Sequence, residues 1–105
     1  MSNERLKKPQ TEIFEYIRRR KGGKVHKVGI VFGVAVDGVI KVGWSKCNFK
    51  AGDKFDTLMG LQMALNRAMG QDIKPTPNCI RRQLRQFGSR CVRYFKNANK
   101  MDIPV

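Results

Sequence analysis

Acidic residues are scarce in this chain. Only 8 Asp and Glu stand against 22 Lys and Arg, which gives 105 residues a formal net charge of +14. A short chain with this excess repels itself, and the repulsion lowers its stability. Polyphosphate backbones are the commonest partners of such proteins, because each neutralised phosphate releases condensed counterions. The composition therefore predicts a strongly negative partner, with nucleic acid as the first choice.

Long apolar runs are missing as well. No run approaches the roughly 20 apolar residues that a membrane-spanning helix needs, and the polar start, Met1 to Lys8, does not resemble a signal peptide. We therefore expect a cytoplasmic protein with no membrane partner. The length and the 41% hydrophobic content suit one globular domain over residues 1–105, with flexible ends at 1–10 and 97–105.

Residues that bind metals or catalyse reactions are few. Three cysteines are present, at widely spaced positions: Cys47, Cys79 and Cys91. A zinc site needs four soft ligands at close spacing, and His26 is the only histidine. We expect the thiols to act as small buried hydrophobes. No nucleophile–base pair, P-loop or glycine-rich nucleotide motif is present, and Asp53 and Asp56 suit helix caps better than a nuclease metal pair. The sequence predicts no enzyme, no metal and no cofactor.

The clearest local signal is a β-hairpin. Asp37-Gly38 lies between two β-rich runs, and both residues tolerate the positive φ of a type I′ turn. A two-residue turn fixes the register of the two strands. The predicted pairs are Val36–Val39, Ala35–Ile40, Val34–Lys41, Gly33–Val42, Phe32–Gly43, Val31–Trp44 and Ile30–Ser45.

The remaining segments favour helices. A first helix is favoured from Thr11 to about Lys21, with acidic residues near its start, basic residues near its end and Gly22-Gly23 as its stop. The alternative for residues 12–17 is a strand. A second begins near Asp53 or Asp56 and ends near Gly70. Its predicted buried stripe is Phe55, Leu58, Met59, Met63, Leu65 and Ala68.

The last helix carries the cleanest periodicity in the chain. Thr76 is its predicted cap, Pro77 its first residue, and Lys96 its approximate end. The apolar residues recur at helical spacing: Ile80, Leu84, Phe87, Cys91 and Phe95.

These elements predict an α+β fold, an antiparallel hairpin or small sheet packed against two or three helices. The hairpin is apolar on both faces, and an isolated hairpin is too small to be stable. We expect helices on one face, and the N-terminal segment or a second subunit, as in a homodimer, on the other.

Two basic clusters are candidates for binding an anion. On the last helix, Arg82, Arg85, Arg93 and Lys96 share one sector away from the apolar stripe, and Arg81 and Arg90 flank it. No Asp or Glu lies between Lys74 and Lys100, whereas a solvated helix face normally mixes charges of both signs. Arginine also presents a flat fork of donors that fits phosphate oxygens in pairs.

The second cluster is broken by Gly22-Gly23. Its members are Arg18, Arg19, Arg20, Lys21, Lys24 and Lys27, and all but Lys27 join the predicted binding set. The segment is either a flexible basic loop or a basic arm that lies in a groove of nucleic acid. Aromatic residues that could stack on bases are Trp44, Phe32, Tyr94 and Phe49, of which Trp44 and Phe32 suit the core better.

One stretch carries a resemblance. Gly43-Trp-Ser-x-Cys47, followed by Asp53-Lys-Phe-Asp56, Gly60, Ala64 and Arg67-Ala68, resembles small, largely uncharacterised proteins encoded by tailed phages. The similarity covers about residues 43–68. It implies a phage accessory protein that acts in an infected bacterial cytoplasm, where such proteins often bind nucleic acid or disable a host machine.

The leading prediction is a small basic protein that binds DNA or RNA through phosphate contacts, with little dependence on sequence. The alternative is an inhibitor whose basic surface docks on a host protein such as a polymerase, a nuclease or a defence complex.

Overall fold

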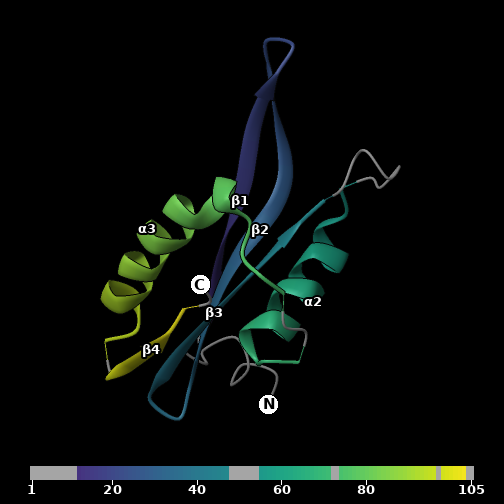
Figure 1. Cartoon of the computed structure of the whole chain (residues 1–105). Helices are drawn as coiled ribbons and strands as arrows, with labels where there is room; N and C mark the ends of the chain where they lie inside the picture. Colours follow the sequence, from purple (N-terminus) through teal and green to yellow (C-terminus); the bar gives the residue numbers. More distant parts are fainter. Residues whose placement is uncertain (1–11, 48–54, 72–73, 97, 104–105) are drawn as a thin grey trace, which may run out of the picture.

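The fold is α+β: a four-stranded sheet, mostly antiparallel, packed against two helices (Figure 1). The computed structural model describes residues 12–47, 55–71, 74–96 and 98–103. The elements are β1 (Glu12–Lys21), β2 (Lys24–Val36), β3 (Val39–Lys46), α2 (Thr57–Ala68), α3 (Asn78–Tyr94) and β4 (Lys100–Asp102). The strands lie in the order β1-β2-β3-β4, and only the β3–β4 pair is parallel.

The β2–β3 hairpin confirms the predicted turn and register. Asp37 and Gly38 have φ of 52° and 79°, which are the two positive values that a type I′ turn requires. All seven predicted cross-strand pairs are present, from Val36–Val39 to Ile30–Ser45. Trp44 and Phe32 are buried, as predicted.

The helix favoured over the first segment is wrong, and the alternative, a strand, is correct. Residues 12–21 form β1, which pairs antiparallel with β2. Gly22 and Gly23 do end the element, but as the two positive-φ residues of a second tight hairpin turn, with φ of 60° and 80°. Ile13 and Ile17 lie on one face whether the chain is helical or extended, so the pairing with β2 decides between the two.

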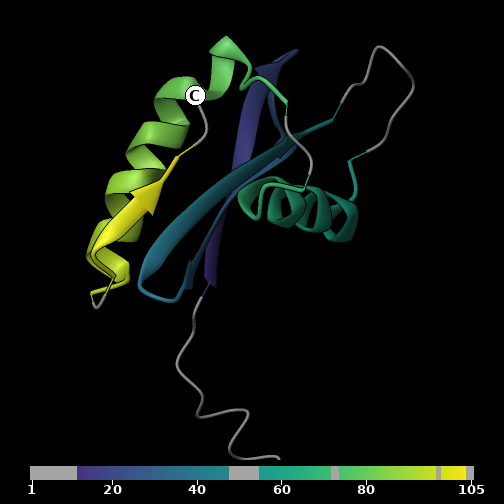
Figure 2. The same cartoon turned by 60° about the horizontal axis from the view of Figure 1, so that its bottom comes forward.

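The two helices lie on opposite faces of the sheet, so that the fold has three layers (Figure 2). One core cluster joins α3 to residues such as Val31, Val42 and Trp44, and the other joins α2 to Ile30 and Phe32. The expectation that helices cover only one face is therefore wrong. Both apolar faces of the hairpin are covered within one chain, which removes the argument for a homodimer.

α2 packs on the sheet mainly through small residues, so the predicted stripe is only partly right: Ala68 is buried, and Phe55 and Leu65 are partly buried against the core. Its buried positions are Gly60, Ala64 and Ala68. Leu58 and Met59, predicted to be buried, are 79% and 63% exposed. The backbone of the helix lies directly over Gly43 of β3, which leaves no room for larger side chains at the contact.

The two ends of α2 follow the sequence prediction. Asp56 caps the helix by accepting a hydrogen bond from the backbone N–H of Met59 at 3.1 Å. Gly70 adopts a φ of 76° just past the last turn. Asp53, the other predicted cap, lies outside the described residues.

α3 confirms the predicted apolar stripe but not its predicted start. Ile80, Leu84, Phe87, Cys91 and the adjoining Phe95 are all buried. Pro77 rather than Thr76 occupies the N-cap position, and no side chain caps the helix. Thr76 is buried instead, and its hydroxyl has no hydrogen-bond partner among the described residues.

The chain after α3 returns to the sheet. Residues 97–105 were expected to be flexible, yet 100–102 form β4, which pairs with residues 39–41 of β3. Backbone hydrogen bonds from Asn99 and Lys100 to the carbonyl of Gly38 fix its start, at 2.9 and 3.4 Å. Residues 1–10 lie outside the described part of the chain.

The three thiols have different surroundings. Cys91 is buried, Cys47 is partly buried and Cys79 is exposed. The prediction of three buried thiols is therefore right only for Cys91.

No helix among the described residues is long and apolar enough to cross a membrane.

Candidate nucleic-acid interface

The β1–β2 hairpin extends past the rest of the molecule as a two-stranded ribbon (Figure 1). We call residues 18–27 the basic arm. All ten of its residues are exposed, and none belongs to either core cluster. Six of them are cationic and none is acidic: Arg18, Arg19, Arg20, Lys21, Lys24 and Lys27.

Like charges face each other across the basic arm. Its four cross-strand pairs are Arg18–Lys27, Arg19–His26, Arg20–Val25 and Lys21–Lys24. Two of the four therefore join cation to cation, an arrangement that destabilises an antiparallel pair. No cation of the arm forms a salt bridge within the described ranges. An anionic ligand would relieve this repulsion.

An aromatic side chain anchors the base of the arm. The Lys27 ammonium lies 4.1 Å, and the Arg18 guanidinium 5.6 Å, from the centre of the Tyr16 ring. Tyr16 in turn makes edge-to-face contacts with Phe14 and Phe55 at centroid distances of 5.5 and 6.0 Å. Cation–π contacts of this kind contribute about 0.5–1 kcal/mol at exposed sites. They hold the first pair of the arm against the body of the protein.

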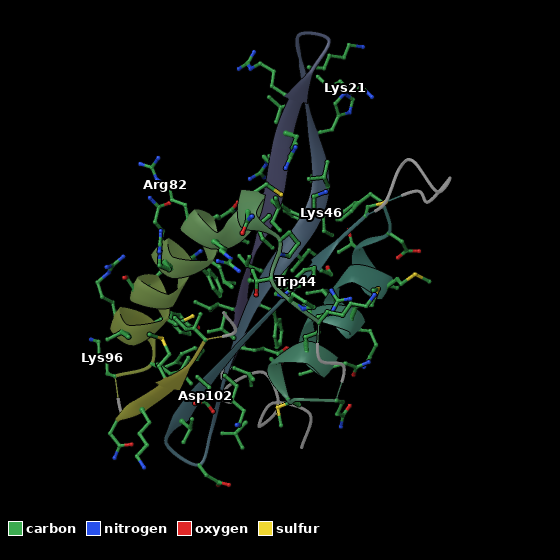
Figure 3. The ribbon with its side chains drawn as sticks, viewed as in Figure 1. Lys21, Trp44, Lys46, Arg82, Lys96 and Asp102 are labelled. Carbon is green, nitrogen blue, oxygen red and sulfur yellow. The ribbon has the colours of Figure 1, made fainter. Side chains whose placement is uncertain are left out.

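The basic arm carries charge on both of its faces. Arg18 and Lys27 lie on the face of Tyr16, and successive pairs alternate between the two faces of a ribbon. Arg20 therefore shares the face of Arg18 and Lys27, and the other three cations lie on the opposite face. Figure 3 shows nitrogen-tipped side chains on both sides of the arm, with Lys21 near its end.

A second basic surface runs along α3. We call Arg82, Arg85, Arg93 and Lys96 the basic helix face. All four are exposed, as is the neighbouring Arg81. In Figure 3, Arg82 and Lys96 both point away from the sheet, one near each end of the helix. The helix contains no acidic residue, so no carboxylate of α3 competes for these cations.

The start of α3 lies beside the base of the arm, so the two basic surfaces adjoin. The Gln83 amide donates a hydrogen bond to the Tyr16 carbonyl at 3.2 Å. Ile80 packs in the same core cluster as Ile17 and Val28, the last buried residues before the arm. The structure thus brings together two clusters that are about 60 residues apart in the sequence.

One residue of the predicted binding set has a partner within the chain. Arg90 forms a salt bridge with Glu15 at 2.6 Å, with 46% of the arginine side chain and 33% of the glutamate side chain exposed. This pairing neutralises the charge of Arg90 locally. Arg90 therefore links α3 to β1 rather than adding to the basic helix face.

The sequence-based set omits one residue that the structure adds. Lys27 faces Arg18 across the ribbon and completes three cations on one face of the arm. The symmetry of basic residues about Gly22-Gly23 is the signal for it, because a two-residue turn pairs positions at equal distances from the glycines.

Aromatic residues give little surface for stacking on bases. Trp44 and Phe32 are buried in the core, whereas Tyr94 and Phe14 are 41% and 39% exposed. Phe49 lies outside the described residues. The Arg67 guanidinium covers the Trp44 ring at 4.1 Å and donates a hydrogen bond to the Trp44 carbonyl at 2.9 Å, so this cation serves the core.

The structure shows no metal-binding cluster among the described residues. No group of three His, Cys, Asp or Glu side chains in the ranges described is placed to hold a metal ion. His26 is exposed on the arm, opposite Arg19. Asp56 caps α2, and its suggested partner Asp53 lies outside the described part.

Comparison of the chain with protein-family models, with curated proteins and with solved structures finds no match. Most of the residues that carry the resemblance to phage proteins lie in the β3–α2 unit. There Gly43 meets Ala64 and Ala68, so a packing requirement accounts for these three positions.

Proposed function

We propose that this protein binds nucleic acid through phosphate contacts made by the basic arm and the basic helix face, with little dependence on base sequence. Ten cations form this surface: six on the arm, three on α3, and Lys96 just after the end of α3. Contacts of Lys and Arg with phosphates fix position and affinity but carry no direct sequence information.

The observation that carries this proposal is the construction of the arm. Its ten residues add nothing to either core cluster, and its cross-strand pairs bring cations together. Neither property helps the fold, since cross-strand repulsion opposes the pairing. A ribbon of this kind is explained by a polyanion that neutralises both strands at once.

Salt dependence of binding tests the proposal. The logarithm of the binding constant falls with the logarithm of salt concentration with a slope of about −0.9 per neutralised phosphate on duplex DNA. Ten contacts would give a slope of about −9. Replacing the six arm cations with Gln should reduce the size of this slope by up to about 5. Fluorescence anisotropy with short labelled oligonucleotides, titrated at several salt concentrations, measures both slopes.

A matched control removes charge elsewhere. Lys74 and Lys100 are exposed and lie on neither basic surface. The double variant Lys74→Gln, Lys100→Gln should leave the slope nearly unchanged, whereas Lys21→Gln, Lys24→Gln should lower its size by about 2. Equal effects of the two double variants would mean that only total charge matters, and the proposed surface would be wrong.

The alternative partner is an acidic patch on a protein. It predicts capture of one particular protein from a nuclease-treated lysate, together with oligonucleotide binding that disappears at physiological salt. The proposal predicts the reverse: oligonucleotide binding that persists near 0.15 M salt, and no stoichiometric protein partner after nuclease treatment.

A further inference from the structure

We infer that the nucleic acid is double-stranded DNA and that the basic arm enters its major groove. This inference rests on the proposed function and adds the class of substrate. Three properties of the arm carry it: cations on both faces, its length, and the small aromatic surface around it.

The distribution of charge fits a groove. Arg18, Arg20 and Lys27 lie on one face of the ribbon, and Arg19, Lys21 and Lys24 on the other. A ribbon lying on a single strand or on a flat surface would use one face only. Within a groove, each face meets the phosphates of one strand, so both sets of three cations are used.

The dimensions fit the same groove. Four cross-strand pairs at about 3.3 Å per residue make the arm about 13 Å long. The major groove of B-form DNA is about 12 Å wide and 8.5 Å deep, and it admits a two-stranded ribbon. The arm therefore reaches the floor of the groove before the body of the protein meets the backbone. The basic helix face, which begins beside the base of the arm, then meets phosphates along the rim.

Other nucleic acids fit less well. The major groove of A-form RNA is deep and too narrow for protein side chains to read. Proteins that bind single strands stack bases on exposed aromatic rings, and the arm contains no Phe, Tyr or Trp. Its nearest aromatic residue, Tyr16, is partly buried, and two cations lie close to its ring.

The decisive test changes the length of the arm at constant charge. Deleting Arg20, Lys21, Lys24 and Val25 removes two pairs, keeps Gly22-Gly23 as a two-residue turn, and shortens the arm to about 7 Å. The matched control keeps the full length and the same net charge through Arg20→Gln, Lys21→Gln and Lys24→Gln. Both proteins lack the same three cations, so any difference in binding between them is due to the length of the arm.

The probes are one 20-base-pair sequence as a DNA duplex, as an RNA duplex and as single-stranded DNA, measured by anisotropy at 0.15 M salt. Wild-type protein should prefer the DNA duplex by at least tenfold. The charge-matched control should bind more weakly but keep that preference, and the short-arm variant should lose it. Equal affinity of the wild type for all three probes, or a preference that survives shortening, would overturn the inference.

A second measurement needs no variant of the protein. A DNA duplex with bulky substituents at C5 of its pyrimidines has an obstructed major groove, and binding to it should weaken at least tenfold. A minor-groove ligand bound to the unmodified duplex should change affinity by less than twofold. The opposite pattern would place the arm in the minor groove and contradict the inference. Absence of binding to every probe would instead refute the proposed function itself.

Discussion

The contact between α2 and the sheet can be tested with one methyl group. A Cβ atom added at Gly43 would overlap the carbonyl oxygen of Ala64 and lie 2.6 Å from the amide nitrogen of Ala68. Both atoms belong to the helix backbone, so no side-chain rotation removes the clash. Comfortable contacts between such atoms are about 3.5 Å, so Gly43→Ala must move α2 away from β3 by about 1 Å.

Moving the helix loosens the packing of Ala64 and Ala68 against the core cluster that joins α2 to Ile30 and Phe32. Inserting one carbon into a well-packed core destabilises by about 1–3 kcal/mol. We expect the upper part of this range because the obstacle is backbone. In a domain of this size, that loss lowers Tm by roughly 10 °C. Thermal unfolding followed by circular dichroism measures the change.

Gly60→Ala is the matched control, on the same helix. Its added Cβ would lie 3.2 Å from the side-chain atoms Ile30 Cδ1 and Ser45 Oγ. A modest repulsion there is offset by the gain of about 1 kcal/mol in helix propensity when Ala replaces Gly. The Tm of Gly60→Ala should therefore stay within a few degrees of the wild type. A Tm for Gly43→Ala equally close to the wild type would refute the backbone contact.

Three further predictions concern individual side chains. Burial raises the pKa of the Cys91 thiol to about 11 from its ordinary value of 9.0. The thiol of the unfolded chain therefore ionises at lower pH than that of the folded protein, so the free energy of unfolding should fall between pH 9 and 11. The same pH titration of Cys91→Ala should show a smaller fall. Glu15→Gln should free Arg90 and tighten oligonucleotide binding a few-fold, while changing stability by less than about 1 kcal/mol in urea titrations, because the pair is half exposed. Replacing the three arginines of the basic helix face with Ala should lower the size of the salt slope by about 3 and leave the circular dichroism spectrum unchanged, whereas an unchanged slope would remove α3 from the interface.

The parts of the fold that local chemistry determines were predictable. Asp37-Gly38 specifies both the turn and the register of β2 and β3, and the stripe on α3 has helical spacing that no strand could satisfy. β1 could not be predicted in this way. Its apolar positions fit either structure, and the strand depends on pairing with β2. The three-residue β4 is too short to leave a sequence pattern.

The buried face of α2 was predicted from its large apolar residues, and this was largely wrong. Large apolar residues were expected to face the core, but Leu58 and Met59 are exposed because the contact with Gly43 admits only small residues. Most of the basic residues of the candidate site were identified from composition. A basic arm was one of two alternatives for this segment, but its two-stranded form was not predicted, because the ribbon exists only once residues 12–21 form a strand.

The most direct test of the proposed interface is an NMR titration of the labelled protein with a short DNA duplex. Backbone amide shifts should change for residues 18–27 and along the basic helix face. The outward side of α2, on the opposite face of the sheet, should remain unchanged. Shift changes confined to α2, with the arm unaffected at saturating DNA, would contradict the account.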